Sequence, residues 1–130
     1  MSNPQPFYLG QKPKRKNKSP EHDIQVKLVA LLNSMTPKPL YTATVGGVRL
    51  AIHTAKKMKA AGYSKGVPDM LIFEPRGMFL GLALEVKTKS GRASDHQKEW
   101  IRSLNDRGWS AHIVHGYDQA EHVIKQYFNE

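Results

Sequence analysis

The chain contains no cysteine, which excludes disulfide bridges and metal sites built from thiolates. No apolar run approaches the roughly 18 residues that a membrane-spanning helix needs, and the first residues, Met-Ser-Asn-Pro-Gln-Pro, are not those of a signal peptide. The sequence also lacks a Ser-His-Asp order, a glycine-rich phosphate loop and a helix-turn-helix signature, which disfavours acyl hydrolases and nucleotide cofactors. These absences predict a soluble, intracellular protein without a membrane partner, in the cytoplasm of its host cell.

Acidic residues are also scarce. The chain has 20 lysines and arginines against 11 acids, for a formal charge of +9. Residues 1–19 contain five basic residues and no acid. This segment is predicted to be a disordered basic arm that contacts phosphates without sequence preference, or a solubility or localisation feature. Residues 20–130 are long enough and, in a chain that is 39% hydrophobic, apolar enough for one domain with a single core.

Two carboxylates and a lysine interrupt the apolar middle of the chain. Asp69 follows residues 66–68, Gly-Val-Pro, and Glu85 stands two residues before Lys87 in a run of leucine, valine and alanine. In a basic protein this combination is typical of a metal-dependent nuclease. A divalent ion held by Asp69 and Glu85 would contact a phosphodiester and a water, lower the pKa of that water and stabilise the charge on phosphorus. Lys87 would lie on the same strand face, near the water or the phosphate.

A β-hairpin is predicted to bring these motifs together. Residues 75–77, Pro-Arg-Gly, suit a three-residue loop, and that register places Asp69 opposite Ala83. Asp69 and Glu85 are then diagonal neighbours on one sheet face, about 7–8 Å apart at the backbone. The other face of the second strand is purely apolar and is the predicted core: Leu80, Leu82, Leu84 and Val86.

Each charged residue also has an ordinary explanation. An aspartate after a proline is common in turns, and a glutamate two residues from a lysine is common at the solvated edge of a sheet. Their joint arrangement is harder to explain, because unpaired charges beside a buried face are costly. The sequence therefore supports a metal-dependent endonuclease, with one alternative from another class: a catalytically silent basic module that binds DNA or RNA.

Periodicity predicts alternating helices and strands in the order α-β-α-β-β-α-β-α, which implies an α/β fold with a mixed sheet flanked by helices. The predicted elements are a helix over 20–35, a strand over 41–45, a helix over 49–61, strands over 69–74 and 78–87, a helix from 94 to Gly108, a strand over 109–114 and a helix from Asp118. Ser19 and Asp118 are expected to cap the first and last helices, and Ser94 with Gln97 forms a capping box.

Glu21 stands in the first turn of the first predicted helix, in line with the apolar residues Leu28 and Leu32. It either points inward as a third carboxylate or complements the helix dipole. His112 and His115 are three residues apart in a strand and therefore face opposite sides, so a shared histidine metal site is disfavoured.

These motifs resemble the VRR-NUC (virus-type replication-repair nuclease) family of the PD-(D/E)XK superfamily, which implies a restriction-endonuclease-like core. The segments that carry the resemblance span residues 20 to 128: Glu21 and Gln25, Lys65 to Asp69, Gly81 to Thr88, Gly91-Arg92, Ser94 to Gln97, and Trp100. The chain departs from the family at 44–49, where members often have Asn-Gly followed by a basic residue.

The resemblance implies that Glu21, Asp69, Glu85 and the Val86 carbonyl bind Mg²⁺ or Mn²⁺. It further implies that Lys87 positions or activates the attacking water and that Gln97 is a catalytic residue. The predicted contacts to nucleic acid are Arg49, Lys57, Lys65, Lys89 and Arg92. The implied function is that of a homodimeric endonuclease that cuts branched DNA, such as four-way (Holliday) junctions, in replication, recombination or repair.

Overall fold

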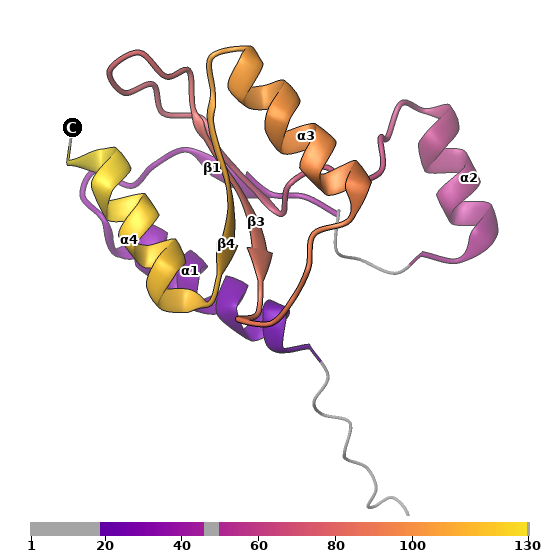
Figure 1. Cartoon of the computed structure of the whole chain (residues 1–130), viewed down its shortest axis with the longest axis horizontal. Helices are drawn as coiled ribbons and strands as arrows, with labels where there is room; N and C mark the ends of the chain where they lie inside the picture. The colour runs from indigo at the N-terminus through magenta and orange to yellow at the C-terminus, as the bar shows by residue number, and fades with distance from the viewer. Residues whose placement is uncertain (1–18, 46–49, 130) are drawn as a thin grey trace, which may run out of the picture.

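The computed structural model describes residues 19–45 and 50–129 and has the predicted order of elements (Figure 1). The elements are α1 (Pro20–Ser34), β1 (Tyr41–Ala43), α2 (Ile52–Ala60), β2 (Met70–Ile72), β3 (Leu82–Lys87), α3 (Asp95–Asp106), β4 (Ser110–His115) and α4 (Tyr117–Phe128). The prediction of an α/β fold is confirmed. The basic arm, except for Ser19, and Arg49 lie outside the described residues.

The four strands form one mixed sheet in the order β1-β2-β3-β4. β1 and β2, and β2 and β3, pair antiparallel, whereas β3 and β4 pair parallel. A parallel pair needs a crossover connection, which α3 provides. Helices α1 and α4 contact each other and one face of the sheet, and α3 contacts β3 and β4 (Figure 1).

Alternation along β3 separates the core from the candidate site. Leu82, Leu84 and Val86 are fully buried in the core that α1 and α4 cover, and Glu85 and Lys87 point to the other face. The apolar stripe predicted on the first helix is confirmed, because Leu28 and Leu32 are fully buried in the same core. Burial of such side chains contributes roughly 1.5–3 kcal/mol each, so this layer supports the strand that carries the site.

The register predicted for the hairpin is wrong by two residues. Ala83 pairs with Leu71, and the same register places Asp69, just before β2, opposite Glu85. The physical reason lies in the turn, where Arg76 and Phe79 exchange backbone hydrogen bonds around residues 77–78. Gly77 has φ +56°, which suits a two-residue turn over 77–78 in place of the predicted three-residue loop over 75–77.

Four smaller expectations are also corrected. Leu80 is 58% exposed, because the strand begins only at Leu82 and Leu80 bonds instead to the loop at Gly108. The last helix begins directly after Gly116, whose φ of +90° turns the chain, so Asp118 lies in the first turn and does not cap it. Ser19 occupies the N-cap of α1 without a side-chain hydrogen bond. The second helix starts at Ile52, and Leu50 and Ala51 precede it.

Helix α2 stands apart from the rest of the fold. It projects from one side of the sheet in Figure 1 and packs closely against no other helix or strand. None of its residues is buried. Burial in the core therefore does not explain this helix. Within the described ranges, no helix has the length and apolar character needed to cross a membrane.

Candidate active site

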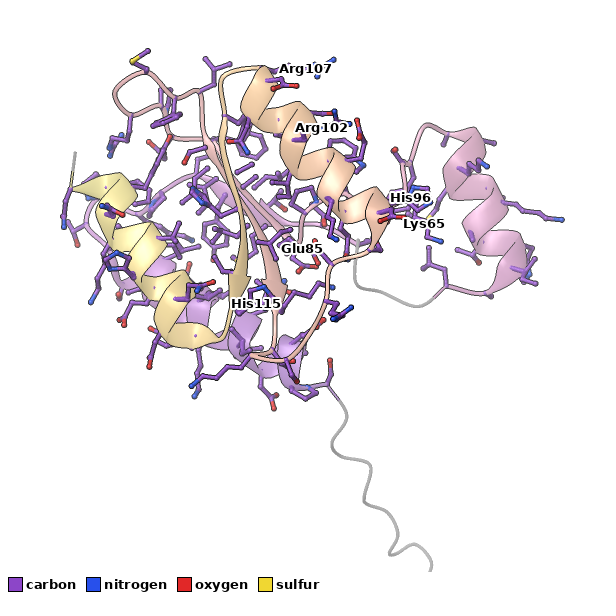
Figure 2. All side chains as sticks on the ribbon, in the orientation of Figure 1. Lys65, Glu85, His96, Arg102, Arg107 and His115 are labelled. Atoms are coloured by element: carbon purple, nitrogen blue, oxygen red, sulfur yellow. The ribbon has the colours of Figure 1, made fainter. Side chains whose placement is uncertain are left out.

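Asp69, Glu85 and Lys87 lie together on the sheet face that α3 covers, as the sequence predicts. All three are almost inaccessible to solvent, with exposed fractions of 8%, 2% and 8%. The strand β3 supplies Glu85 and Lys87, and the segment that enters β2 supplies Asp69. Figure 2 shows Glu85 on the sheet, close to the first turn of α3. Three ionisable groups are thus buried in one place.

Short contacts join these groups. The Asp69 Oδ2 atom accepts a hydrogen bond of 2.8 Å from the backbone N–H of Val86. The Lys87 Nζ atom lies 3.4 Å from the Glu85 Oε2 atom. The carboxyls of Asp69 and Glu85 are themselves within hydrogen-bonding reach of each other. One lysine faces two carboxylates, so the cluster keeps an excess of negative charge when both are ionised.

The pKa values reflect this excess. Burial, with the charge of Asp69 added to it, raises the pKa of Glu85 from its usual 4.5 to about 8, although Lys87 opposes the shift. Burial also raises the pKa of Asp69, and the Val86 N–H acts against it. Two facing carboxyls share a proton for this reason, and a cation can replace that proton.

Metal-free protein is therefore expected to lose stability as pH rises from about 4.5 to about 8. The unfolded chain releases the Glu85 proton near the lower value and the folded chain holds it up to the higher one, so folding binds protons across this window. Thermal unfolding in chelator should show Glu85→Gln gaining stability over wild type as pH rises. A difference that stays constant across the window would contradict this prediction.

The site also fits a hard divalent cation. Glu85 Oε1 is buried and has no hydrogen-bond partner, the only such side-chain atom among the described residues. A buried unpaired carboxylate oxygen is costly, and a cation bound by oxygen ligands would satisfy it. The Val86 N–H points at Asp69, and the carbonyl of a strand residue lies on the same side as its N–H. Asp69, Glu85 and the Val86 carbonyl thus form a donor set that suits Mg²⁺ or Mn²⁺.

Glu21 lies beside this pair. It is half-buried at the start of α1, its Oε2 atom borders Gly91, and its negative charge contributes to the raised pKa of Asp69. Across residues 19–45 and 50–129, however, no three acidic, histidine or cysteine side chains gather closely enough to hold a metal ion. The structure brings Asp69 and Glu85 into one cluster and leaves Glu21 at its border, and its role as a ligand stays a prediction.

Gln97 connects the first turn of α3 to the site. Its Oε1 atom accepts from the Ser94 backbone N–H at 2.8 Å, and its backbone N–H donates to the Ser94 hydroxyl, so the predicted capping box is confirmed. Its Nε2 atom donates to the Glu85 Oε2 atom at 2.9 Å. One amide side chain therefore caps the helix and also orients a buried carboxylate.

The basic residues predicted to bind nucleic acid are dispersed. Lys57 lies on α2, Lys65 in the loop before Asp69, and Lys89 and Arg92 in the loop between β3 and α3; all four are exposed. The two strand histidines have separate partners, since His112 bonds to the Ser110 hydroxyl and His115 to the Thr88 carbonyl.

Two contacts that hold the loop before Asp69 were not predicted. The Trp100 indole Nε1–H donates to the Lys65 carbonyl at 3.1 Å. Gly66 has φ +93°, and a Cβ there would come within 2.7 Å of the His96 backbone. The sequence signal was present, because a glycine stands just before the aspartate motif, but its partner lies 30 residues away. These contacts fix the path of the chain into the site.

Comparisons with known proteins agree with this geometry. The sequence model of the VRR-NUC domain matches residues 23–118, a range that includes Asp69, Glu85, Lys87 and Gln97 and begins two residues after Glu21. A solved structure described as a VRR_NUC domain protein is 28% identical, with a TM-score of 0.73 over 84% of this chain and 88% of the other. Another, described as a VRR_NUC domain, is 20% identical, with a TM-score of 0.57 over 82% and 96%, and supports the fold alone. No curated protein sequence matches the chain.

Proposed function

The chain belongs to the VRR-NUC family and has its nuclease-type fold, and on this basis we propose that it is a metal-dependent endonuclease that hydrolyses phosphodiester bonds in branched DNA. The proposal rests on one observation above all: the buried pair of Asp69 and Glu85 beside Lys87, with Glu85 Oε1 left without a partner. The proposed cellular process is replication, recombination or repair.

In the proposed mechanism, Asp69, Glu85 and the Val86 carbonyl hold Mg²⁺ or Mn²⁺, and Glu21 is a further candidate ligand. The chemistry that a bound ion supplies is a water of lowered pKa and a positive charge beside the phosphate. Besides the charge of the ion, Lys87 adds a second positive charge, on a buried ammonium group that pairs with Glu85. This group positions the attacking water or a phosphate oxygen. Gln97 holds Glu85 through Oε2, which leaves Oε1 free for the metal.

The proposed substrate is DNA with a branch point. The charge of +9 and the exposed side chains of Lys57, Lys65, Lys89 and Arg92 support binding to a polyanion. The proposed assembly is a homodimer, because two active sites about a twofold axis suit paired cuts across a four-way junction.

The test is cleavage of a labelled four-way junction, with linear duplex and single strand as comparators, in Mg²⁺ or Mn²⁺ and again in chelator. Metal-dependent paired nicks on the junction support the full proposal. Equal cleavage of all substrates would remove the preference for branches and keep the nuclease. Salt-sensitive binding without cleavage in either metal would favour the silent basic binding module instead.

The two roles of Gln97, in the capping box and in the hydrogen bond to Glu85, can be separated by mutation. Ser94→Ala removes the cap alone and is expected to cost about 1 kcal/mol of stability while cleavage stays near wild type. Gln97→Ala removes the bond to Glu85 and the half of the capping box in which the Gln97 Oε1 atom accepts from the Ser94 backbone N–H, so we expect a similar loss of stability and cleavage about 10–100-fold slower, as for other groups that orient metal ligands. Thermal unfolding and single-turnover cleavage measure the two effects. Equal cleavage by both variants would show that the bond from Gln97 to Glu85 has no catalytic importance.

A further inference from the structure

A cavity of about 500 Å³ lies between α2, the loop that follows it and the first turn of α3. Its walls include Leu50, Ala55, Lys59, Tyr63, Lys65 and His96. Figure 2 shows Lys65 and His96 together at the end of α3 that faces α2. The volume falls within the roughly 300–1,000 Å³ of pockets that take small organic molecules.

The cavity is connected to the candidate active site on both sides. The loop that carries Tyr63 and Lys65 continues into Asp69, and Trp100 and the close approach of Gly66 to His96 hold this loop on α3. On the α3 side, the residue after His96 is Gln97, which bonds to Glu85. A group bound in the cavity would therefore lie next to the candidate active site. A DNA strand bound in the active site could then place a neighbouring nucleotide in the cavity.

The charge around the cavity indicates an anionic occupant. The sequence has no acidic residue between Asp23 and Asp69, and this stretch supplies α2 with its three lysines and the loop up to Lys65. Among the described elements, helix α2 packs closely against no other helix or strand. A contribution to the core therefore does not explain why the chain has this helix. A tyrosine ring and aliphatic side chains line the cavity among the cations, and this mixture of a flat apolar wall and positive charge matches a nucleobase with its phosphate.

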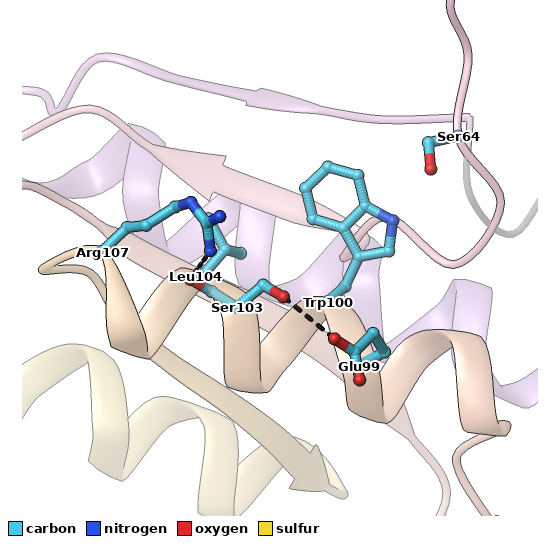
Figure 3. A pocket seen from close by; sticks show the side chains of 6 residues that line it. All are labelled: Ser64, Glu99, Trp100, Ser103, Leu104 and Arg107. Carbon is cyan, nitrogen blue, oxygen red and sulfur yellow. Dashed lines mark hydrogen bonds between the residues drawn. The ribbon is translucent and has the colours of Figure 1, made fainter.

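A second cavity, of about 330 Å³, lies further along α3 between Ser64, Trp100 and Arg107 (Figure 3). Glu99 lines it, and the indole N–H of Trp100 is already bonded to the Lys65 carbonyl. A carboxylate in the wall disfavours a phosphate. The cavity beside α2 is therefore the better candidate, and Arg107 provides a matched control at the far end of the same helix.

We propose that the cavity beside α2 binds one unpaired nucleotide of a DNA strand, with its base stacked on Tyr63 and its phosphate between Lys59 and Lys65. The inference rests on the proposed function, because a branch that opens or that carries a single-stranded flap presents unpaired nucleotides to the protein. It explains how the domain itself would distinguish a branch from linear duplex: the duplex offers no free base to the cavity.

Binding in chelator tests this directly. The probes are two fluorescein-labelled duplexes, one blunt and one with a short single-stranded tail, and the readout is anisotropy with the full chain. Wild type should prefer the tailed duplex. Tyr63→Ala should weaken binding to the tailed duplex by about 5–100-fold, the usual contribution of a base stacked on an aromatic ring, and change binding to the blunt duplex by less than about twofold. Tyr63→Phe, which keeps the ring, and Arg107→Ala should keep the preference.

Ala55→Glu, which places a carboxylate in the wall of the cavity from α2, should abolish the preference independently and covers the case in which Tyr63→Ala does not fold. Equal losses on both duplexes, or an unchanged preference in both cavity variants, would overturn the inference. If wild type cleaves junctions while these variants keep the preference, the nuclease stands and the nucleotide site is wrong. If the variants lose the preference and wild type cleaves nothing, the nucleotide site stands and the nuclease is wrong.

Discussion

Glu85→Gln is expected to slow cleavage of a four-way junction by about a thousandfold or more, since loss of a metal ligand removes several kcal/mol of stabilisation from the transition state. Binding to the same junction should be kept or improved, because glutamine cannot carry the negative charge that Glu85 acquires when it loses its proton. The amide has the size of the carboxyl and can still accept the hydrogen bond from Gln97. Single-turnover cleavage in Mg²⁺ and anisotropy in chelator measure the two quantities.

Glu99→Gln is the matched control, since Glu99 is an exposed glutamate on α3 that pairs with Arg102. It should cleave at the wild-type rate. The thermal unfolding of Glu85→Gln in chelator provides a second check, because folded wild type must hold a proton on Glu85 near neutral pH and glutamine needs none, so the variant should be at least as stable as wild type. Cleavage by Glu85→Gln within about tenfold of wild type would mean that the carboxylate pair is structural.

Gly66→Ala is expected to combine a large loss of stability with a loss of cleavage. The backbone φ of +93° already disfavours any side chain. A Cβ would also lie 2.7 Å from a backbone carbon of His96, in a helix turn that the capping box holds in place. Relief of such a clash requires a backbone shift. Shifts of this kind in overpacked cores typically cost about 1–3 kcal/mol. Because the loop leads directly to Asp69, the shift should displace that carboxylate.

Gly62→Ala isolates the part of this effect that comes from the backbone conformation. Gly62 has a similar φ of +109°, but a Cβ there would meet no atom within 4 Å. It should therefore show only the cost of the backbone conformation, about 1–2 kcal/mol, and nearly normal cleavage. Urea unfolding gives the two free energies. Equal destabilisation by the two variants would contradict the importance of the contact between Gly66 and His96.

Local patterns were sufficient to predict the order of elements and the common sheet face of Asp69, Glu85 and Lys87. The stripe of Leu28 and Leu32 predicted the first helix, and Ser94 with Gln97 predicted the start of α3, because both signals arise from residues within one or two turns. The shared face of Asp69 and Glu85 was predicted even though the register was wrong by two residues. Strand side chains alternate with a period of two, so a shift of two changes the neighbours and keeps the faces.

Contacts between distant residues were beyond these patterns. The hydrogen bond from Trp100 to Lys65 joins residues 35 apart in the sequence. The backbone that lies against Gly66 is that of His96, in helix α3. The bond from Gln97 to Glu85 exists only because α3 lies across the sheet. The cavity beside α2 depends on the same long-range packing, which is why Lys57 and Lys65 were predicted to contact nucleic acid but Tyr63 was not.

The packing of α1 against α4 has a consequence for the order of assembly. These helices lie at opposite ends of the described chain, and both cover β3, whose parallel partner β4 also comes late in the sequence. Contacts of such long sequence separation require loop closure before they contribute, and folds built from them form slowly. A chain still emerging from the ribosome therefore lacks the support that α4 gives to α1 and to the strand of Glu85. Synthesis of the last helix is the step at which the strand that carries Glu85 acquires its full support on the core face.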